Sequence, residues 1–177
     1  TEIYTLSLHD ALPICLLRHR WWDDRDAERA LGADALRRLE DAVATSERRH
    51  GGEIRICIEA SLPLAWLWRD ATARERAVAM FGELRVWDTE ANNGVLIYLL
   101  LAEHAIEIVA DRGVARHVPQ GHWDEVLAHM REHFRAGRYE QGLAQAVAEV
   151  DELLARHFPL AEGAANPDEL PNRVVRR

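Results

Sequence analysis

The chain has 177 residues, of which 48% are hydrophobic, so it can bury one substantial core and we expect a single domain with flanking segments. The net charge is -8 and no basic block occurs, which excludes an extended nucleic-acid-binding surface. Two cysteines do not make a disulfide framework, and no apolar run approaches the roughly 20 residues of a transmembrane helix.

Residues 1–14, TEIYTLSLHDALPI, differ in composition from the rest of the chain. They contain no arginine, although arginine is otherwise the chain's basic residue, and they concentrate Thr, Ile and Leu. The string resembles the read-through translation of a sequencing adapter, so it is excluded from fold reasoning. We expect a domain over residues 15–158 and a disordered tail over residues 159–177, which is rich in Pro, Gly, Ala and Asn. With no charged signal region visible, the expected location is cytoplasmic.

The first native-looking segment carries Trp21 and Trp22 between basic and acidic residues. These rings could anchor the chain to a membrane surface or a partner, but we favour the interpretation that they cover an edge of the core. Asp34 is then expected to cap a helix that runs to about His50, because Leu36, Leu39 and Val43 recur at helical spacing. Two glycines at 51 and 52 end that helix.

A strand–helix–strand unit follows. Alternating isoleucines predict a strand over Glu53–Glu59, an apolar loop spans Leu62–Arg69, and Thr72–Leu84 has the pattern of a helix. The unbroken apolar run Val95–Leu101 predicts a strand that is buried on both faces. The two strands should run parallel, since a helix connects them.

The short polar break after Val95–Leu101 predicts a hairpin. Residues Ala105–Ala110 alternate between apolar and polar, so they are expected to pair antiparallel with the preceding strand. Two helices come next, the first around Trp123–Phe134 and the second over Tyr139–His157. Helices on both faces of the sheet would give an α/β fold, a three-layer α/β/α sandwich around a small mixed sheet.

The hairpin and the parallel strand place several oxygen donors at one end of the sheet. The start of Val95–Leu101 should lie beside the end of Ala105–Ala110 and beside the start of Glu53–Glu59. Carboxylate and amide oxygens are the ligands that Ca²⁺ and Mg²⁺ prefer. The predicted metal ligands are therefore Asp88, Asn92, Asn93, Asp111 and Glu53, with Glu90, Arg112 and Gly113 lining the same site. The alternative is an ordinary polar loop with Asx turns.

Other catalytic patterns are weak. His122, His129 and His133 share one flank of a predicted helix, but Met130 stands where a zinc-protease motif needs glutamate, so we favour a solvated flank. No nucleophile elbow and no phosphate-binding glycine loop occur, and Ser46 and Ser61 show no evident base partner. No catalytic residue is assigned.

Several segments, in order and spacing, resemble the TPM domain family, which includes thylakoid-lumen acid-phosphatase-like proteins. They are Arg49-His50-Gly51-Gly52, the helix end Met80-Phe81-Gly82-Glu83-Leu84, the strand start Asn93-Gly94-Val95-Leu96-Ile97, and FRAGRYEQGL at residues 134–143. The family's usual Gly-Tyr-Gly after the second hairpin strand is here Asp111-Arg112-Gly113.

The resemblance implies the same α/β/α sandwich and a divalent-metal site holding Ca²⁺ or Mg²⁺. It also leaves two functions open. The first is an accessory module that recognises a partner protein, which the scarcity of nucleophile motifs favours. The second is a metal-dependent phosphatase that hydrolyses phosphomonoesters. The sequence names neither the partner nor the oligomeric state.

Overall fold

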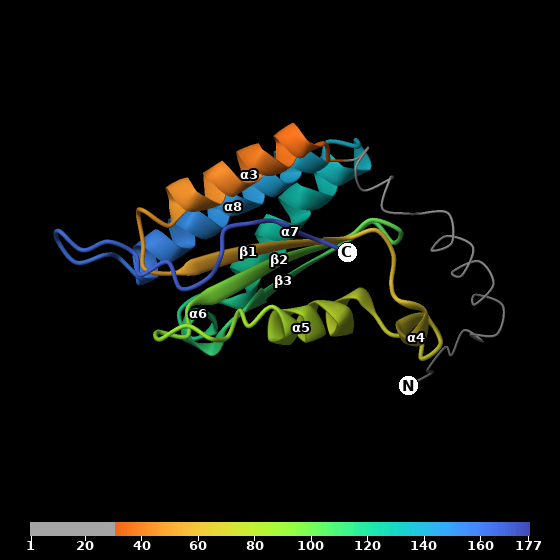
Figure 1. The fold of residues 1–177 in the computed structure, drawn as a ribbon, viewed down its shortest axis with the longest axis horizontal. Coiled ribbons are helices and arrows are strands. Elements are labelled where there is room, and N and C mark those ends of the chain that lie inside the picture. The colour runs from red at the N-terminus through yellow and green to blue at the C-terminus, as the bar shows by residue number, and fades with distance from the viewer. Residues whose placement is uncertain (1–30) are drawn as a thin grey trace.

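In a computed structural model of the protein, residues 31–177 are described, and a four-stranded sheet lies between helices on both of its faces (Figure 1). The expectations for residues 1–14 and for Trp21 and Trp22 lie outside the described residues. The strand order is β3-β2-β1-β4; β2 is antiparallel to β3, and β1 is parallel to both β2 and β4. The strands are β1 (Glu53–Glu59), β2 (Gly94–Leu100), β3 (Ala105–Ala110) and β4 (Val175–Arg176). The predicted α/β sandwich is thus confirmed.

Strand β2 is the centre of the fold, as its unbroken apolar sequence predicts. All seven of its residues are buried, and it pairs with β1 on one side and β3 on the other. Val95, Ile97 and Leu99 point to one hydrophobic core. Leu96, Tyr98 and Leu100 point to a second core on the opposite face. A strand buried on both faces needs cover on both, which the two helical layers supply.

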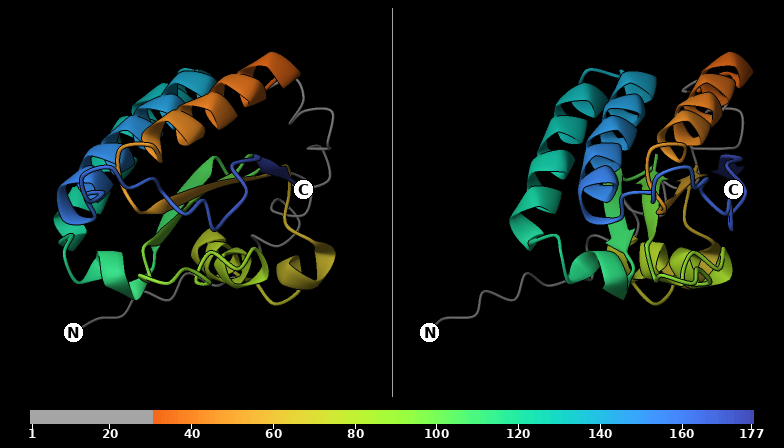
Figure 2. Two further views of the ribbon diagram at one scale, coloured as in Figure 1. Left: turned by 60° about the vertical axis from the view of Figure 1, so that its left-hand side comes forward. Right: turned by 90° about the vertical axis from the view of Figure 1, so that its left-hand side faces the viewer.

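One helical layer is larger than the other, as the two views of Figure 2 show. The larger layer consists of α3 (Ala33–Ser46), α7 (Gln120–Arg135) and α8 (Tyr139–His157), in which α8 packs against both of the others. The smaller layer is built on α5 (Ala73–Glu83), which packs on β2 and β3, with the single turn α4 (Leu64–Leu67) beside it. The short α6 (Arg112–Ala115) follows β3 directly.

Helix starts differ in how they are capped. Thr72 caps α5 with a full capping box, since its side chain accepts from the Glu75 amide and the Glu75 carboxylate accepts from the Thr72 amide. The predicted cap of α3 is wrong. Gly32 is the N-cap there, and Asp34 lies in the first turn, where it pairs with Arg37. A carboxylate in the first turn still complements the helix dipole.

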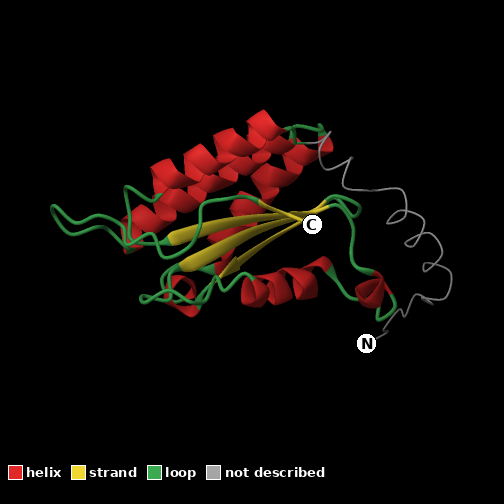
Figure 3. Ribbon diagram, in the orientation of Figure 1, coloured by secondary structure: helices red, strands yellow, loops and turns green. Residues whose placement is uncertain are grey.

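The prediction of a disordered tail is also corrected. Residues 159–177, called here the closing segment, run back along the sheet and end in β4 beside β1 (Figure 3). Leu170 and Val174 are buried, and the Glu40 carboxylate accepts from the Val174 amide at 2.9 Å. The composition of the closing segment suggested disorder. Its apolar residues pack beside the open edge of β1, however, and these tertiary contacts order the segment.

Candidate functional site

The corner formed by the starts of β1 and β2 and the end of β3 is held by backbone hydrogen bonds. The Asp111 amide donates to the Gly94 carbonyl at 2.9 Å, and the Gly113 amide donates to the Asn92 carbonyl at 3.0 Å. The Glu53 amide donates to the Asn93 carbonyl at 3.3 Å. The structure therefore brings together the three backbone segments that the hairpin geometry predicts.

Local geometry explains why asparagine and glycine occur at this corner. Asn92 has a φ of +52°, which is in the left-handed region that asparagine tolerates better than most residues. A Cβ on Gly113 would lie 2.4 Å from the Asn92 carbonyl oxygen, so only glycine allows this approach. Arg112 completes the contact by donating from Nε to Oδ1 of Asn92 at 2.8 Å.

Two buried side-chain oxygens at the corner have no hydrogen-bond partner among the described residues. Asp111 caps α6 with Oδ1, which accepts from the Arg112 amide at 2.6 Å, while its Oδ2 is buried without a hydrogen-bond partner among the described residues. The side-chain nitrogen Nδ2 of Asn93 donates to the Gly51 carbonyl at 2.6 Å, and the side-chain oxygen Oδ1 of the same residue is likewise buried and unpartnered. Both side chains thus keep one buried oxygen without a hydrogen-bond donor among the described residues.

The other predicted ligands lie differently. Asp88 and Glu90 are exposed, and the Glu90 amide donates to the Glu169 carboxylate at 3.0 Å. Glu53 is fully buried, and its carboxylate accepts from the Glu169 and Leu170 amides, each at 3.2 Å. The Glu53 carboxylate therefore faces the closing segment.

A second group of carboxylates surrounds Glu53. One oxygen each of Glu47, Glu53 and Asp168 lies within 4.8 Å of the others, which makes them the one trio of acidic, histidine or cysteine side chains this close together within residues 31–177. Burial and the negative charge of Asp168 raise the pKa of Glu53 to about 7. The sequence analysis missed Glu47 and Asp168 because one lies within a predicted helix and the other in a segment expected to be disordered.

Ser46 has a partner that the sequence did not reveal. Its Oγ lies 2.9 Å from Nε2 of His50 and donates to Oδ1 of Asp151 at 3.0 Å. Nδ1 of His50 lies 3.1 Å from the Gly52 carbonyl oxygen and 3.2 Å from the Gly52 amide nitrogen, so the ring is held at residue 52 as well as at Ser46. Arg49 holds the second oxygen of Asp151. The expectation that Ser46 lacks a basic partner is therefore wrong.

The hydrogen bonds among Ser46, His50 and Asp151 are consistent with a structural role. A nucleophilic serine gives its proton to histidine, whereas Ser46 donates to the Asp151 carboxylate. Burial also lowers the pKa of His50, and the negative charge of Asp151 opposes that shift. The arrangement fastens the end of α3 to α8.

The predicted histidine flank of α7 is engaged in ordinary contacts. Nδ1 of His129 lies 2.9 Å from the Glu149 carboxylate, and Nε2 of His133 lies 2.8 Å from the side-chain oxygen of Gln145. Both partners belong to α8. These histidines therefore link two helices at the surface of the larger layer.

The fold and the corner together define an α/β/α sandwich with hard-oxygen donors at one end of its sheet. The family model of the TPM domain matches residues 25–153, and the chain belongs to that family. This confirms the resemblance seen in the sequence.

Two solved structures resemble the chain. One is the NMR structure of the BA42 protein from the psychrophilic bacterium Bizionia argentinensis, with 27% identity, a TM-score of 0.72, and coverage of 83% of this chain and 95% of that one. The other is the N-terminal domain of a protein from P. gingivalis, with 21% identity, a TM-score of 0.59, and coverage of 74% and 82%; it shows the fold alone. No curated protein matches the sequence.

Among residues 31–177, no helix combines the length and the apolar character that crossing a bilayer requires.

Proposed function

We propose that the chain is a non-catalytic accessory module that recognises a partner protein through its smaller helical layer. One observation carries this proposal. Within residues 31–177, the exposed large hydrophobic side chains all belong to α4 and the residue that ends it, to α5, or to the loop that follows α5. They are Leu64, Trp68, Val78 and Trp87.

Such a concentration favours recognition over a random scatter of surface apolar groups. Single exposed hydrophobic residues are ordinary, but a set confined to one layer is typical of an interaction surface. Trp68 is 78% exposed, and tryptophan is the residue type most enriched at binding hot spots. Arg69 lies over the ring of neighbouring Trp66 with 4.1 Å between its guanidinium carbon and the ring centroid, which holds that edge of the layer in place. The partner should therefore present an apolar surface.

The corner at Asn93 and Asp111 adds a divalent cation, Ca²⁺ or Mg²⁺, to this proposal. The ion would supply positive charge to the unpartnered oxygens of both side chains and would fix the start of β2 against α6. The Arg112 side chain donates to Asn92, and the oxygens of Asp111 and Asn93 receive no hydrogen bond from it. The ion would stabilise the module rather than activate water.

The recognition surface is tested by site-specific photocrosslinking in cells of the source organism. A photoreactive residue at position 68 should give a discrete protein adduct, and Leu64→Ser should remove it. The control is the same photoreactive residue at exposed position 132 on α7. No adduct beyond the control, or a crosslink only to residues 15–30 of the same chain, would contradict recognition of a partner.

Ion binding at the corner of Asn93 and Asp111 and the alternative phosphatase activity are tested together. Thermal unfolding in excess EDTA and in millimolar Ca²⁺ should show a larger ion-dependent shift for the wild type than for Asp111→Asn, a variant that keeps a good helix cap. The same proteins are assayed on a generic phosphomonoester with Mg²⁺ or Ca²⁺. Turnover that Asp111→Asn abolishes would replace the accessory function by the phosphatase.

A further inference from the structure

We propose that a cavity between α7 and the β2–β3 hairpin binds the phosphate group of a small phosphorylated organic molecule. The cavity has a volume of about 380 Å³ and is lined by His104, Arg131, Phe134 and Arg135. Pockets for small organic ligands begin at about 300 Å³, so this one has room for such a molecule together with its phosphate group. It lies at the hairpin end of β2 and β3, whereas the corner at Asp111 lies at their other end.

The two arginines of the cavity have no partner of their own. Within residues 31–177, no hydrogen bond or ion pair engages the guanidinium group of Arg131 or of Arg135, and both side chains are exposed. They are four positions apart on α7, so they share one face of the helix and repel each other. The helix dipole favours a cation in the last turn, where Arg135 lies, but Arg131 lies one turn earlier. An anion bound between the two would relieve their repulsion.

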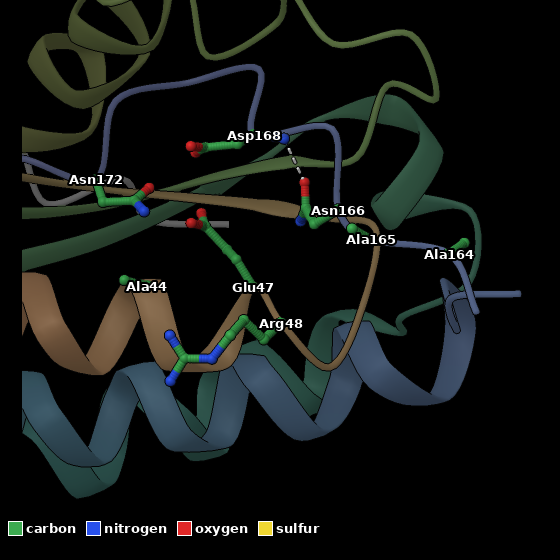
Figure 4. A pocket seen from close by; sticks show the side chains of 8 residues that line it. All are labelled: Ala44, Glu47, Arg48, Ala164, Ala165, Asn166, Asp168 and Asn172. Atoms are coloured by element: carbon green, nitrogen blue, oxygen red, sulfur yellow. Dashed lines mark hydrogen bonds between the residues drawn. The ribbon is translucent and has the colours of Figure 1, made fainter. Parts of the chain in front are cut away.

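Arginines that line another groove are already neutralised. Arg38 and Arg49 line the groove between α3 and α8, and each pairs with a carboxylate of α8. A third cavity, between α3 and the closing segment, is drawn in Figure 4 and is lined by the acidic side chains Glu47 and Asp168. Of these three cavities, the one beside α7 alone presents two guanidinium groups without a carboxylate partner among the described residues.

The segment FRAGRYEQGL, residues 134–143, holds the cavity in shape. Phe134 packs on Tyr139 with 5.2 Å between the ring centroids. A Cβ on Gly142 would lie 2.5 Å from the Phe134 ring, so glycine at this position lets the ring lie against α8. The Tyr139 hydroxyl lies 3.4 Å from Nδ1 of His104, so α8 also contacts the hairpin. The floor of the cavity and its hairpin wall are thereby fixed before a ligand arrives, which lowers the entropic cost of binding.

His104 occupies a position whose backbone conformation suits glycine. Its φ is +50°, in the left-handed region, and its amide donates to the Leu101 carbonyl at 3.0 Å to close the turn. A residue with a Cβ is strained in this conformation, although histidine adopts it more often than most. The side chain gained in return lines the cavity, where its ring adds an N–H donor to those of the arginines.

The charges favour a phosphate monoester over a carboxylate. A phosphate monoester carries about −1.5 to −2 charges at pH 7 and three strong acceptor oxygens. A carboxylate carries a single charge and two oxygens, which one guanidinium group can match with two parallel hydrogen bonds. Two guanidinium groups and an imidazole therefore suit the phosphate better. Phe134 offers an apolar contact to the organic part of the ligand.

The test uses the full chain and phenylphosphonate, a phosphate-like dianion on an aromatic ring. Its carbon–phosphorus bond resists hydrolysis, so binding is measured independently of any phosphatase activity. Isothermal titration calorimetry gives the Kd, and amide shifts in ¹H–¹⁵N spectra locate the site, with the largest shifts expected around residues 104, 131 and 135. Benzenesulfonate has three oxygens but one negative charge, and it should bind at least tenfold more weakly.

Two further ligands identify the source of the phosphate group. Inorganic phosphate lacks an organic part and should bind more weakly than phenylphosphonate. Phosphatidylcholine vesicles that contain phosphatidic acid should retain no more protein than vesicles of phosphatidylcholine alone. Retention on the phosphatidic acid vesicles without binding of phenylphosphonate would assign the cavity to a lipid headgroup and would overturn the inference.

Variants separate this cavity from a general effect of positive charge. Arg131→Gln and Arg135→Gln should fold, because both positions are exposed and glutamine suits a helix, and each should weaken phenylphosphonate binding at least tenfold. His104→Asn keeps a residue that tolerates the left-handed region and should also weaken binding. Arg116→Gln, at an exposed arginine beyond the other end of β3, should bind like the wild type, and so should Asp168→Asn.

Three more outcomes would overturn the inference. They are no binding of phenylphosphonate at millimolar concentration, equal affinity for benzenesulfonate, or a loss in Arg116→Gln as large as the loss in Arg131→Gln and Arg135→Gln. None of these results bears on recognition of a partner through the smaller helical layer or on the corner at Asp111, whose tests use other residues.

Discussion

Replacing Arg76 by methionine tests the buried ionic contact in the smaller layer. Arg76 is nearly fully buried, and it donates to both oxygens of Glu59 at 2.9 and 2.5 Å. Tyr98 donates to the same carboxylate at 2.6 Å, and the Arg76 guanidinium carbon lies 4.9 Å from the centroid of the Trp66 ring. Methionine keeps much of the side chain's length but leaves the Glu59 charge buried with Tyr98 as its remaining side-chain donor.

The expected cost follows from that uncompensated charge. Removing one partner of a buried ion pair costs about 3 to 5 kcal/mol, which for a chain of this size lowers Tm by about 6 to 20 °C.

Urea unfolding of Arg76→Met and of the wild type measures the loss. The control is Arg37→Met, which breaks an exposed pair with Asp34 on α3 and should cost less than about 1 kcal/mol. The double variant Arg76→Met/Glu59→Gln should recover at least half of the loss, since it also removes the charge. A loss below about 1 kcal/mol for Arg76→Met, or a double variant no better than the single one, would refute the reasoning.

Two further predictions concern the sheet start and the end of α3. Gly94→Ala should cost about 3 kcal/mol in urea unfolding, since its Cβ would lie 2.0 Å from the Val86 carbonyl oxygen. In the control Gly82→Ala in α5, the new Cβ meets nothing within 4 Å and should stabilise the fold by about 0.5 to 1 kcal/mol. Equal effects of the two substitutions on the free energy of unfolding would contradict this reasoning. Burial lowers the pKa of His50 from its ordinary 6.5, so its contribution to stability is present above that pH and is lost as pH falls below it. His50→Gln should therefore lose less stability than the wild type between pH 7 and pH 5, and parallel pH profiles from urea unfolding would show that His50 does not titrate in this way.

Patterns that depend on neighbouring residues could be predicted from the sequence. The run Val95–Leu101 indicated a central strand because continuous apolarity has few other solutions, and β2 covers nearly the same residues. The brief polar break after it indicated a hairpin, and the pairing of Val95 with Ala110 agrees. The meeting of Asn92, Asp111 and Gly113 followed from those two inferences.

Contacts between distant residues could not be predicted in the same way. The closing segment has a loop-like composition, and only the open edge of β1 reveals what orders Leu170 and Val174. Glu47 and Asp168 are 121 positions apart by number, so no spacing rule relates them. The bond from Ser46 to Asp151 likewise joins two helices that the helical pattern identified separately.

The parallel pairing of β4 with β1 also sets an order of events during synthesis. The partner of Cys57 in this pairing is Val175, so β1 leaves the ribosome long before the residues that cover its outer edge exist. Until then the nascent chain exposes an unpaired strand edge that is rich in isoleucine, which is a surface to which another chain can add. A chaperone that shields this edge would raise the yield of folded protein most for chains whose translation stalls before residue 170.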